Sequence, residues 1–113
     1  TVIDLDTLTV SEVSISTRAS RSQISPDGTY AYVAVVSGGD GVWRINLKSM
    51  TTDGPKLITG NMGSVGYAYS RTSDLVLSHD GATLITCDSF DDTITIIDTA
   101  SWSVTATVAM MLS

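Results

Sequence analysis

A short turn motif occurs twice in this chain, and its repetition limits the fold more than any other feature. The two copies are Ser25–Thr29 (Ser-Pro-Asp-Gly-Thr) and Ser78–Thr83 (Ser-His-Asp-Gly-Ala-Thr). A β-rich run follows each copy, and a second run then ends in an amide or an acid, at Asn46 and at Asp98; a matching end stands at Asp4. Repeated supersecondary units of this kind bury their apolar faces against their neighbours.

The spacing of these ends predicts the architecture. Asp4 and Asn46 are 42 positions apart, whereas Asn46 and Asp98 are 52 apart. The excess fits an insertion of the Gly/Tyr/Ser stretch at 60–70. A period of about 40 to 45 residues with four short strands per unit is typical of a β-propeller blade. We therefore predict an all-β fold of about two and a half four-stranded antiparallel blades, an incomplete propeller unless it is assembled or part of a longer chain.

Runs of β-branched and aromatic residues predict the strands. Residues 30–36 form a continuous run of this type, which indicates a strand that is buried on both faces. A polar stretch at 17–22 is expected to be a connection, and no segment has the apolar period of a helix. The expected strands are Val10–Ile15, Gln23–Ile24, Tyr30–Val36, Val42–Asn46, Lys56–Thr59, Asp74–Leu77, Thr83–Asp88, Thr93–Asp98 and Ser103–Ala109.

The whole chain, 1–113, is expected to be one propeller segment. Residues 1–16 form the outer half of one blade, 17–59 a second blade, 60–70 an inserted loop and 71–113 a third blade. Propellers close with at least four blades, so the chain is a piece of a longer propeller, assembles with copies of itself, or receives blades from other subunits. We favour the first, because the chain starts inside a blade with the character of a strand, not of a leader peptide. A single copy would leave an apolar blade face uncovered, so we expect no stable monomer.

Charge and composition exclude some classes of partner. The 113 residues include six Lys and Arg against twelve Asp and Glu, for a net charge of −6. Nucleic-acid binding depends on clustered cations, so it is not expected, and no apolar run reaches the length of a membrane span. Cys87 is the only cysteine and excludes an intrachain disulfide; its place in a strand predicts a packed, inert thiol.

Candidate binding residues lie on a loop and in a turn. Tyr67 and Tyr69 stand in the Gly-rich insertion, a composition typical of recognition surfaces. Trp102, in the Ala-Ser-Trp turn, is expected to be exposed and is a further candidate for contact with a protein or a glycan. For the insertion we favour a plain flexible loop over ligand contact, and for the tryptophans we favour packing on blade strands and turns, more strongly at Trp43 than at Trp102.

An acidic loop is the candidate metal site. Asp88, Asp91 and Asp92 could offer hard oxygen ligands to Ca²⁺, although their spacing does not match an EF-hand; a solvated hairpin turn is the alternative. His79 is the only histidine and is expected to be a turn residue. No set of catalytic residues emerges, and no cofactor is expected, with calcium possible.

The quoted motifs carry a family resemblance. Ser-Pro-Asp-Gly at 25–28, Tyr-Ala-Tyr-Val-Ala at 30–34 and Thr-Ile-Thr-Ile-Ile-Asp-Thr at 93–99 resemble the YVTN-type β-propeller repeat of surface-layer and related proteins. The resemblance implies a structural or interaction module outside the cytoplasm (secreted, periplasmic or on the cell surface), a setting that an acidic, Lys-poor surface suits. Similar propellers also form lactonases and the scaffolds of quinoprotein or haem-containing dehydrogenases, so the competing hypothesis is part of an enzyme whose active centre lies mostly outside this chain.

Overall fold

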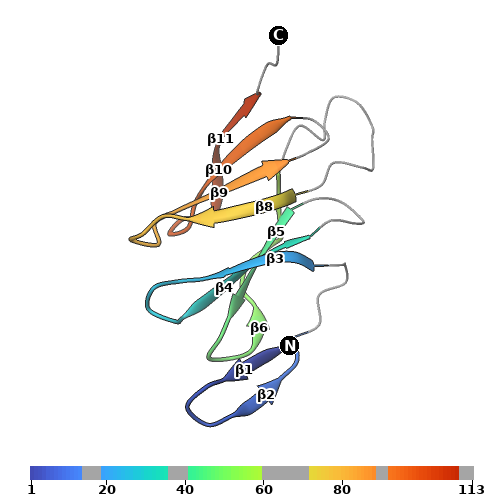
Figure 1. Cartoon of the computed structure of the whole chain (residues 1–113). Coiled ribbons are helices and arrows are strands. Elements are labelled where there is room, and N and C mark those ends of the chain that lie inside the picture. Colours follow the sequence, from blue (N-terminus) through green and yellow to red (C-terminus); the bar gives the residue numbers. More distant parts are fainter. Residues whose placement is uncertain (14–18, 36–40, 60–71, 89–91, 110–113) are drawn as a thin grey trace.

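The structure is a computed structural model that describes residues 1–13, 19–35, 41–59, 72–88 and 92–109. Within these ranges every regular element is a β-strand, and the strands form three antiparallel sheets stacked along one axis (Figure 1). No helix long and apolar enough to cross a membrane is found among the described residues. The sheets do not close into a ring, and the molecule measures 51 × 28 × 22 Å.

Apart from β6 and β7, consecutive strands pair in each sheet, so the chain runs as a series of meanders. The first hairpin consists of β1 (Val2–Asp4) and β2 (Thr9–Ser11). The middle sheet consists of β3 (Ala19–Ile24), β4 (Tyr30–Val35), β5 (Gly41–Asn46), β6 (Thr51–Thr52) and β7 (Leu57–Ile58). Its outer edge is split, since β6 and β7 pair with opposite ends of β5. The last sheet consists of β8 (Thr72–Leu77), β9 (Thr83–Asp88), β10 (Thr93–Asp98) and β11 (Ser103–Ala109).

The core lies between the middle sheet and the last sheet. Alternation along β10 buries Thr93, Thr95 and Ile97 on the face toward the middle sheet. Both faces of β4 are covered, as the continuous apolar run predicts. The core cluster consists of Tyr32, Ala34 and Val42 from the middle sheet and Leu75, Leu84, Ile97 and Trp102 from the last.

The two Ser-x-Asp-Gly motifs form the same turn. The hydroxyls of Ser25 and Ser78 each donate to the carboxylate two residues later, over 2.7 Å in both copies. That carboxylate, of Asp27 or Asp80, also accepts a backbone N–H over 3.0 Å. The following glycine takes a left-handed conformation, with φ of 75° at Gly28 and 78° at Gly81, which explains why glycine stands there. His79 is exposed in its turn.

A second turn occurs three times and marks the end of the third strand of each unit. The side chains of Asp4, Asn46 and Asp98 each accept a backbone N–H from two residues further along the chain. The residue four positions after each one has a positive φ, namely 56° at Leu8, 57° at Met50 and 51° at Trp102. This geometry places β1 in the same position in its unit as β5 and β10.

The predicted all-β fold of four-stranded antiparallel units is therefore confirmed, and β9, β10 and β11 begin and end where expected. The polar connection predicted at 17–22 is wrong, since β3 already begins at Ala19. Backbone pairing with β4 forms this strand, and such pairing requires no apolar side chain. The strand expected at Val10–Ile15 begins one residue earlier and already ends at Ser11, as Thr9–Ser11, and the inserted loop at 60–70 lies outside the described residues.

The carboxylates of the Ser-x-Asp-Gly turns predict a loss of stability in acid. Backbone N–H of Ala82 and the hydroxyl of Ser78 hold the pKa of Asp80 below its ordinary value of 3.8. Because the folded-state pKa is depressed, the stabilisation is complete above the ordinary pKa and is lost as the pH falls through the folded-state value. Asp80→Asn keeps the acceptor oxygen but removes the charge. We expect the difference in urea midpoint between wild type and Asp80→Asn to be constant above about pH 5 and to shrink below pH 4; a difference that stays constant down to pH 2.5 would contradict this.

Candidate functional site

An aromatic and cationic stack joins the middle sheet to the last sheet. Trp102 is only 6% exposed, and its ring lies on Tyr32 with centroids 5.7 Å apart. The guanidinium of Arg44 lies 4.8 Å from the Trp102 ring and 5.0 Å from the Tyr30 ring. The indole Nε1 donates to the carbonyl of Pro55 over 2.8 Å. Cation–π attraction and stacking thus act together at this junction.

Arg44 also forms polar contacts with both sheets. Its Nη1 donates to the carbonyl of Thr99 over 3.1 Å, and its Nε donates to the carbonyl of Asp53 over 3.3 Å. The Asp53 carboxylate lies 3.6 Å from Nη2. A Cβ at Gly54 would lie 3.1 Å from the Trp102 ring, and Gly54 has a φ of 81°, so a side chain at this position would be strained. Burial raises the pKa of the neighbouring Tyr32.

These contacts correct the prediction that Trp102 is exposed. The positive φ of Trp102 turns the residue out of the strand direction, and its side chain covers the core and does not face solvent. The other two predicted binding residues, Tyr67 and Tyr69, lie outside the described residues. Trp102 therefore has a packing role in this structure that its position in a polar turn did not indicate.

Asp88 lies at the centre of a buried cluster of threonines. Its Oδ1 accepts from Thr59 over 2.9 Å, and its Oδ2 accepts from Thr95 over 3.1 Å and from Thr86 and Thr93 over 3.4 Å each. Hydroxyl donors satisfy a carboxylate that would otherwise be costly to bury. The alternation of the predicted strands already puts Thr86, Thr93 and Thr95 on the same face as Asp88. This cluster could therefore have been predicted from the sequence.

The predicted calcium ligands are only partly described. Asp88 is buried among these hydroxyls, Asp92 is exposed with a φ of 51°, and Asp91 lies outside the described residues. Over the described ranges, no group of three His, Cys, Asp or Glu side chains could hold a metal ion.

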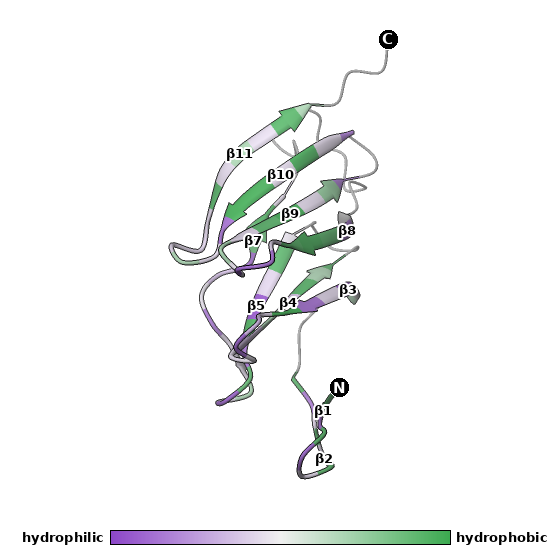
Figure 2. Cartoon of the chain, turned by 60° about the vertical axis from the view of Figure 1, so that its left-hand side comes forward, coloured by the Kyte–Doolittle hydropathy of each residue, from purple (hydrophilic) through white to green (hydrophobic). Residues whose placement is uncertain are grey.

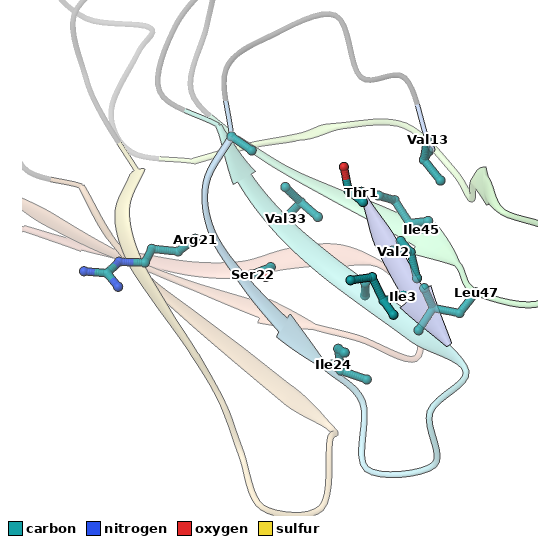
Figure 3. Close-up of a pocket in the computed structure, with 12 residues that line it drawn as sticks. Thr1, Val2, Ile3, Val13, Arg21, Ser22, Ile24, Val33, Ile45 and Leu47 are labelled. Carbon is teal, nitrogen blue, oxygen red and sulfur yellow. The ribbon is translucent and has the colours of Figure 1, made fainter. Parts of the chain in front are cut away.

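A groove of about 660 Å³ separates the first hairpin from the middle sheet (Figure 3). Val2, Ile3 and Val13 line it from the side of the first hairpin. The middle sheet contributes residues of β3, β4 and β5 and the start of the following turn. The apolar residues on that side are Ala19, Ile24, Ala31, Val33, Ile45 and Leu47, and the polar ones are Arg21 and Ser22.

The last sheet has an uncovered apolar face on the side away from the middle sheet, which we call the open face. Register pairs Val76 with Ile85 and Ile85 with Ile96, so these side chains form one row across the sheet. Ile94 and Val108 form a second row, together with Cys87. Val76 is 60% exposed and Val108 is 49% exposed, and Figure 2 shows hydrophobic segments along these strands.

Cys87 lies on the open face and is exposed, so the prediction of a packed thiol is wrong. Alternation along β9 buries Thr86 and Asp88 on the core side and turns Cys87 to the other side.

Comparison with known proteins identifies the arrangement of the sheets. No family model and no curated protein sequence matches the chain. Among solved structures, hydrazine synthase of Kuenenia stuttgartiensis, which contains a β-propeller, is similar with a TM-score of 0.78 and 20% sequence identity. The chain has a β-propeller-like fold. The three sheets are thus partial and complete blades of a propeller that does not close in this chain.

The extent of the match is unequal for the two proteins. The alignment covers 96% of this chain but only 28% of the hydrazine synthase chain. At 20% identity the likeness shows the fold alone, and the resemblance to YVTN-type repeats stays a prediction.

The stack at the junction predicts a large loss of stability on truncation. Trp102→Ala removes a buried indole and its contacts with Arg44 and Tyr32, so we expect the free energy of unfolding to fall by about 3–5 kcal/mol. Trp102→Phe keeps a ring but loses the hydrogen bond to Pro55, so we expect the free energy of unfolding to fall by about 1 kcal/mol. Met50→Ala is the matched control, because Met50 has the same backbone conformation in the preceding unit. Urea denaturation at one fixed protein concentration measures all three; a Trp102→Ala loss no larger than that of Met50→Ala would show that the stack is dispensable.

Proposed function

We propose that this chain is a structural and interaction module, a segment of a YVTN-like β-propeller that packs against further blades and presents its loops to a protein or glycan ligand. The observation that carries the proposal is the open face. Ile85, Ile94 and Ile96 occupy the positions in the last sheet that Tyr32, Val42 and Arg44 occupy in the middle sheet, as the equivalence of Asn46 with Asp98 requires.

The same face of the repeat is therefore buried in one sheet and open in the next. In the middle sheet it is covered by the last sheet, where Tyr32 and Val42 are buried. Covering a large aliphatic side chain contributes about 1.5–3 kcal/mol, and contiguous apolar patches of this kind mark protein contacts. A further blade of a propeller, or another copy of this chain, has a sheet face that could cover the open face.

Location and ligand belong to the same proposal. The resemblance to surface-layer propellers and the net charge of −6 support a place outside the cytoplasm. The Gly-rich insertion with Tyr67 and Tyr69 is the loop that we assign to ligand contact, on the ground of its composition.

The open face predicts self-association of the isolated chain. We expect sedimentation velocity to show assemblies for the wild type and a shift toward monomer for Val108→Lys, because a charge on the open face opposes burial. Thr107→Lys is the matched control: Thr107 is exposed on the same strand but points to the opposite side. A monomeric, folded wild type, or equal behaviour of the two lysine variants, would overturn the proposal.

Cys87 reports on the same contact without any substitution. If the open face is covered in the assemblies, the reaction of this thiol with a maleimide should slow as the protein concentration rises. The same dependence should be absent in Val108→Lys, where the thiol stays accessible at every concentration.

The alternative is a part of a propeller enzyme whose active centre lies mostly outside this chain. The name of the hydrazine synthase neighbour favours it, since that protein is an enzyme. A metal or a coloured cofactor in the purified protein, detected by elemental analysis or an absorption spectrum, would favour this hypothesis.

If the chain is a structural module, we expect it to bind neither a metal nor a cofactor. Calcium at the acidic loop is the one exception that the sequence leaves open. Titration of Ca²⁺ followed by calorimetry decides this point. Heat that Asp92→Asn abolishes would support a site formed with Asp88 and Asp91, and no heat in the wild type would remove calcium from the proposal.

A further inference from the structure

The first hairpin repeats the outer half of each complete blade. Its Asp4 turn has the hydrogen bonds and the positive φ, at Leu8, that follow Asn46 in the middle sheet and Asp98 in the last. β1 is therefore a third strand and β2 a fourth strand. In the two complete sheets the third strand pairs on its inner side with β4 or with β9.

No described strand pairs with the inner edge of β1. In the complete sheets the residue directly after Asn46 or Asp98 begins that pairing: Leu47 N donates to Thr29 O over 2.9 Å, and Thr99 N donates to Ala82 O over 3.1 Å. The equivalent donor is the backbone N–H of Leu5. Within the described ranges nothing corresponding to Thr29 or Ala82 lies beside it, because β1 pairs only with β2. Ladder alternation gives Ile3 the same edge as Leu5.

The groove lies where the inner strands of this blade would be. On the other side of the middle sheet, its inner strand β3 packs on β8, the inner strand of the last sheet. The groove continues that line of inner strands, since Ile24 of β3 and Ala31 and Val33 of β4 line it. Its apolar side chains are open to solvent, with Ile3 56% and Ile24 61% exposed, and they lie beside the polar side chains of Thr1, Arg21 and Ser22. Figure 3 shows Ile3, Ile24 and Val33 gathered around this space.

We propose that the groove is the docking site of a β-hairpin, made of two inner strands joined by a Ser-x-Asp-Gly turn, whose second strand pairs along β1. The inference rests on the proposed function and specifies what completes the first blade. An apolar face of the hairpin covers Ile24 and Val33, while its backbone forms hydrogen bonds with the backbone groups of Ile3 and Leu5. A blade face of another copy could cover the apolar walls but would leave the edge of β1 unpaired.

The repeat also fixes the register of the hairpin. The residue that starts the second inner strand lies opposite the turn acid or amide: Tyr30 pairs with Asn46, and Thr83 pairs with Asp98. In the hairpin the corresponding residue lies opposite Asp4. The next two residues then lie opposite Ile3 and Val2, as Ala31 and Tyr32 lie opposite Ile45 and Arg44.

A grafted copy of the inner strands tests this docking. Because Asp4 corresponds to Asn46, residue 42 is the counterpart of the position just before Thr1. An N-terminal extension that repeats residues 19–42 directly before Thr1 therefore supplies a hairpin in the right register, on the full chain. We expect amide hydrogen exchange, measured by NMR, to slow about tenfold or more at Ile3 and Leu5 relative to the chain without the extension.

A matched control separates docking from mere attachment. In the control extension, lysines replace the copies of Tyr32 and Ala34, the two positions that face the next blade in the complete repeat. We expect no slowing at Ile3 and Leu5 with this extension. The amide of Leu47, bonded to Thr29, should stay protected in all three proteins and reports that the middle sheet is folded.

Three results would overturn the proposal. They are unchanged exchange at Ile3 and Leu5 with the first extension, equal slowing with both extensions, and protection of these amides in the unextended chain that rises with protein concentration. The third result would identify a second copy as the occupant. Because Val108→Lys acts on the open face at the other end of the molecule, its sedimentation result stands or fails separately, and failure of the docking leaves the proposed function intact.

Discussion

The fold depends on the burial of one sheet face by the next sheet along the chain. One face of the middle sheet is buried because the last sheet supplies Leu75, Leu84 and Ile97 against it. An antiparallel meander of four short strands is too thin to enclose a core of its own. Cohesion therefore comes from the contacts between sheets, and the stack of Arg44, Trp102 and Tyr32 is the most specific of them.

Backbone geometry sets the spacing that allows this burial. Each complete sheet begins its second strand with a Ser-x-Asp-Gly turn, and the third strand of every unit ends in an Asx turn. The N–H of the residue directly after the turn amide or acid, Leu47 or Thr99, bonds to the carbonyl of the residue that precedes the second strand. These bonds lock strands two and three in the same register in both sheets. Equivalent side chains then point to equivalent faces, and the faces of successive units match.

Much of the fold could be predicted because turn chemistry is local. Gly28 and Gly81 identify their turns from the sequence, and the alternation in Thr93–Asp98 identifies its strand. Only the end of the strand at Ala19–Ile24 was predicted, as Gln23–Ile24. Its first part could not be found, because the backbone of β4 determines it and its own side chains are largely polar. The sequence suggested that Trp102 was exposed, since nothing local indicates that Arg44 and Pro55, about half the chain away, form its surroundings.

The left-handed residues at Leu8, Met50 and Trp102 have one further consequence. A backbone conformation that disfavours most side chains occurs in all three units, yet only the tryptophan fills an inter-sheet space with its ring. The conformation of the turn therefore does not determine how strongly the two sheets pack against each other. A change of the side chain at this one site would alter the packing energy between neighbouring units and leave the backbone conformation of the turn unchanged. Rigid and flexible junctions between units could therefore alternate within one repeat protein.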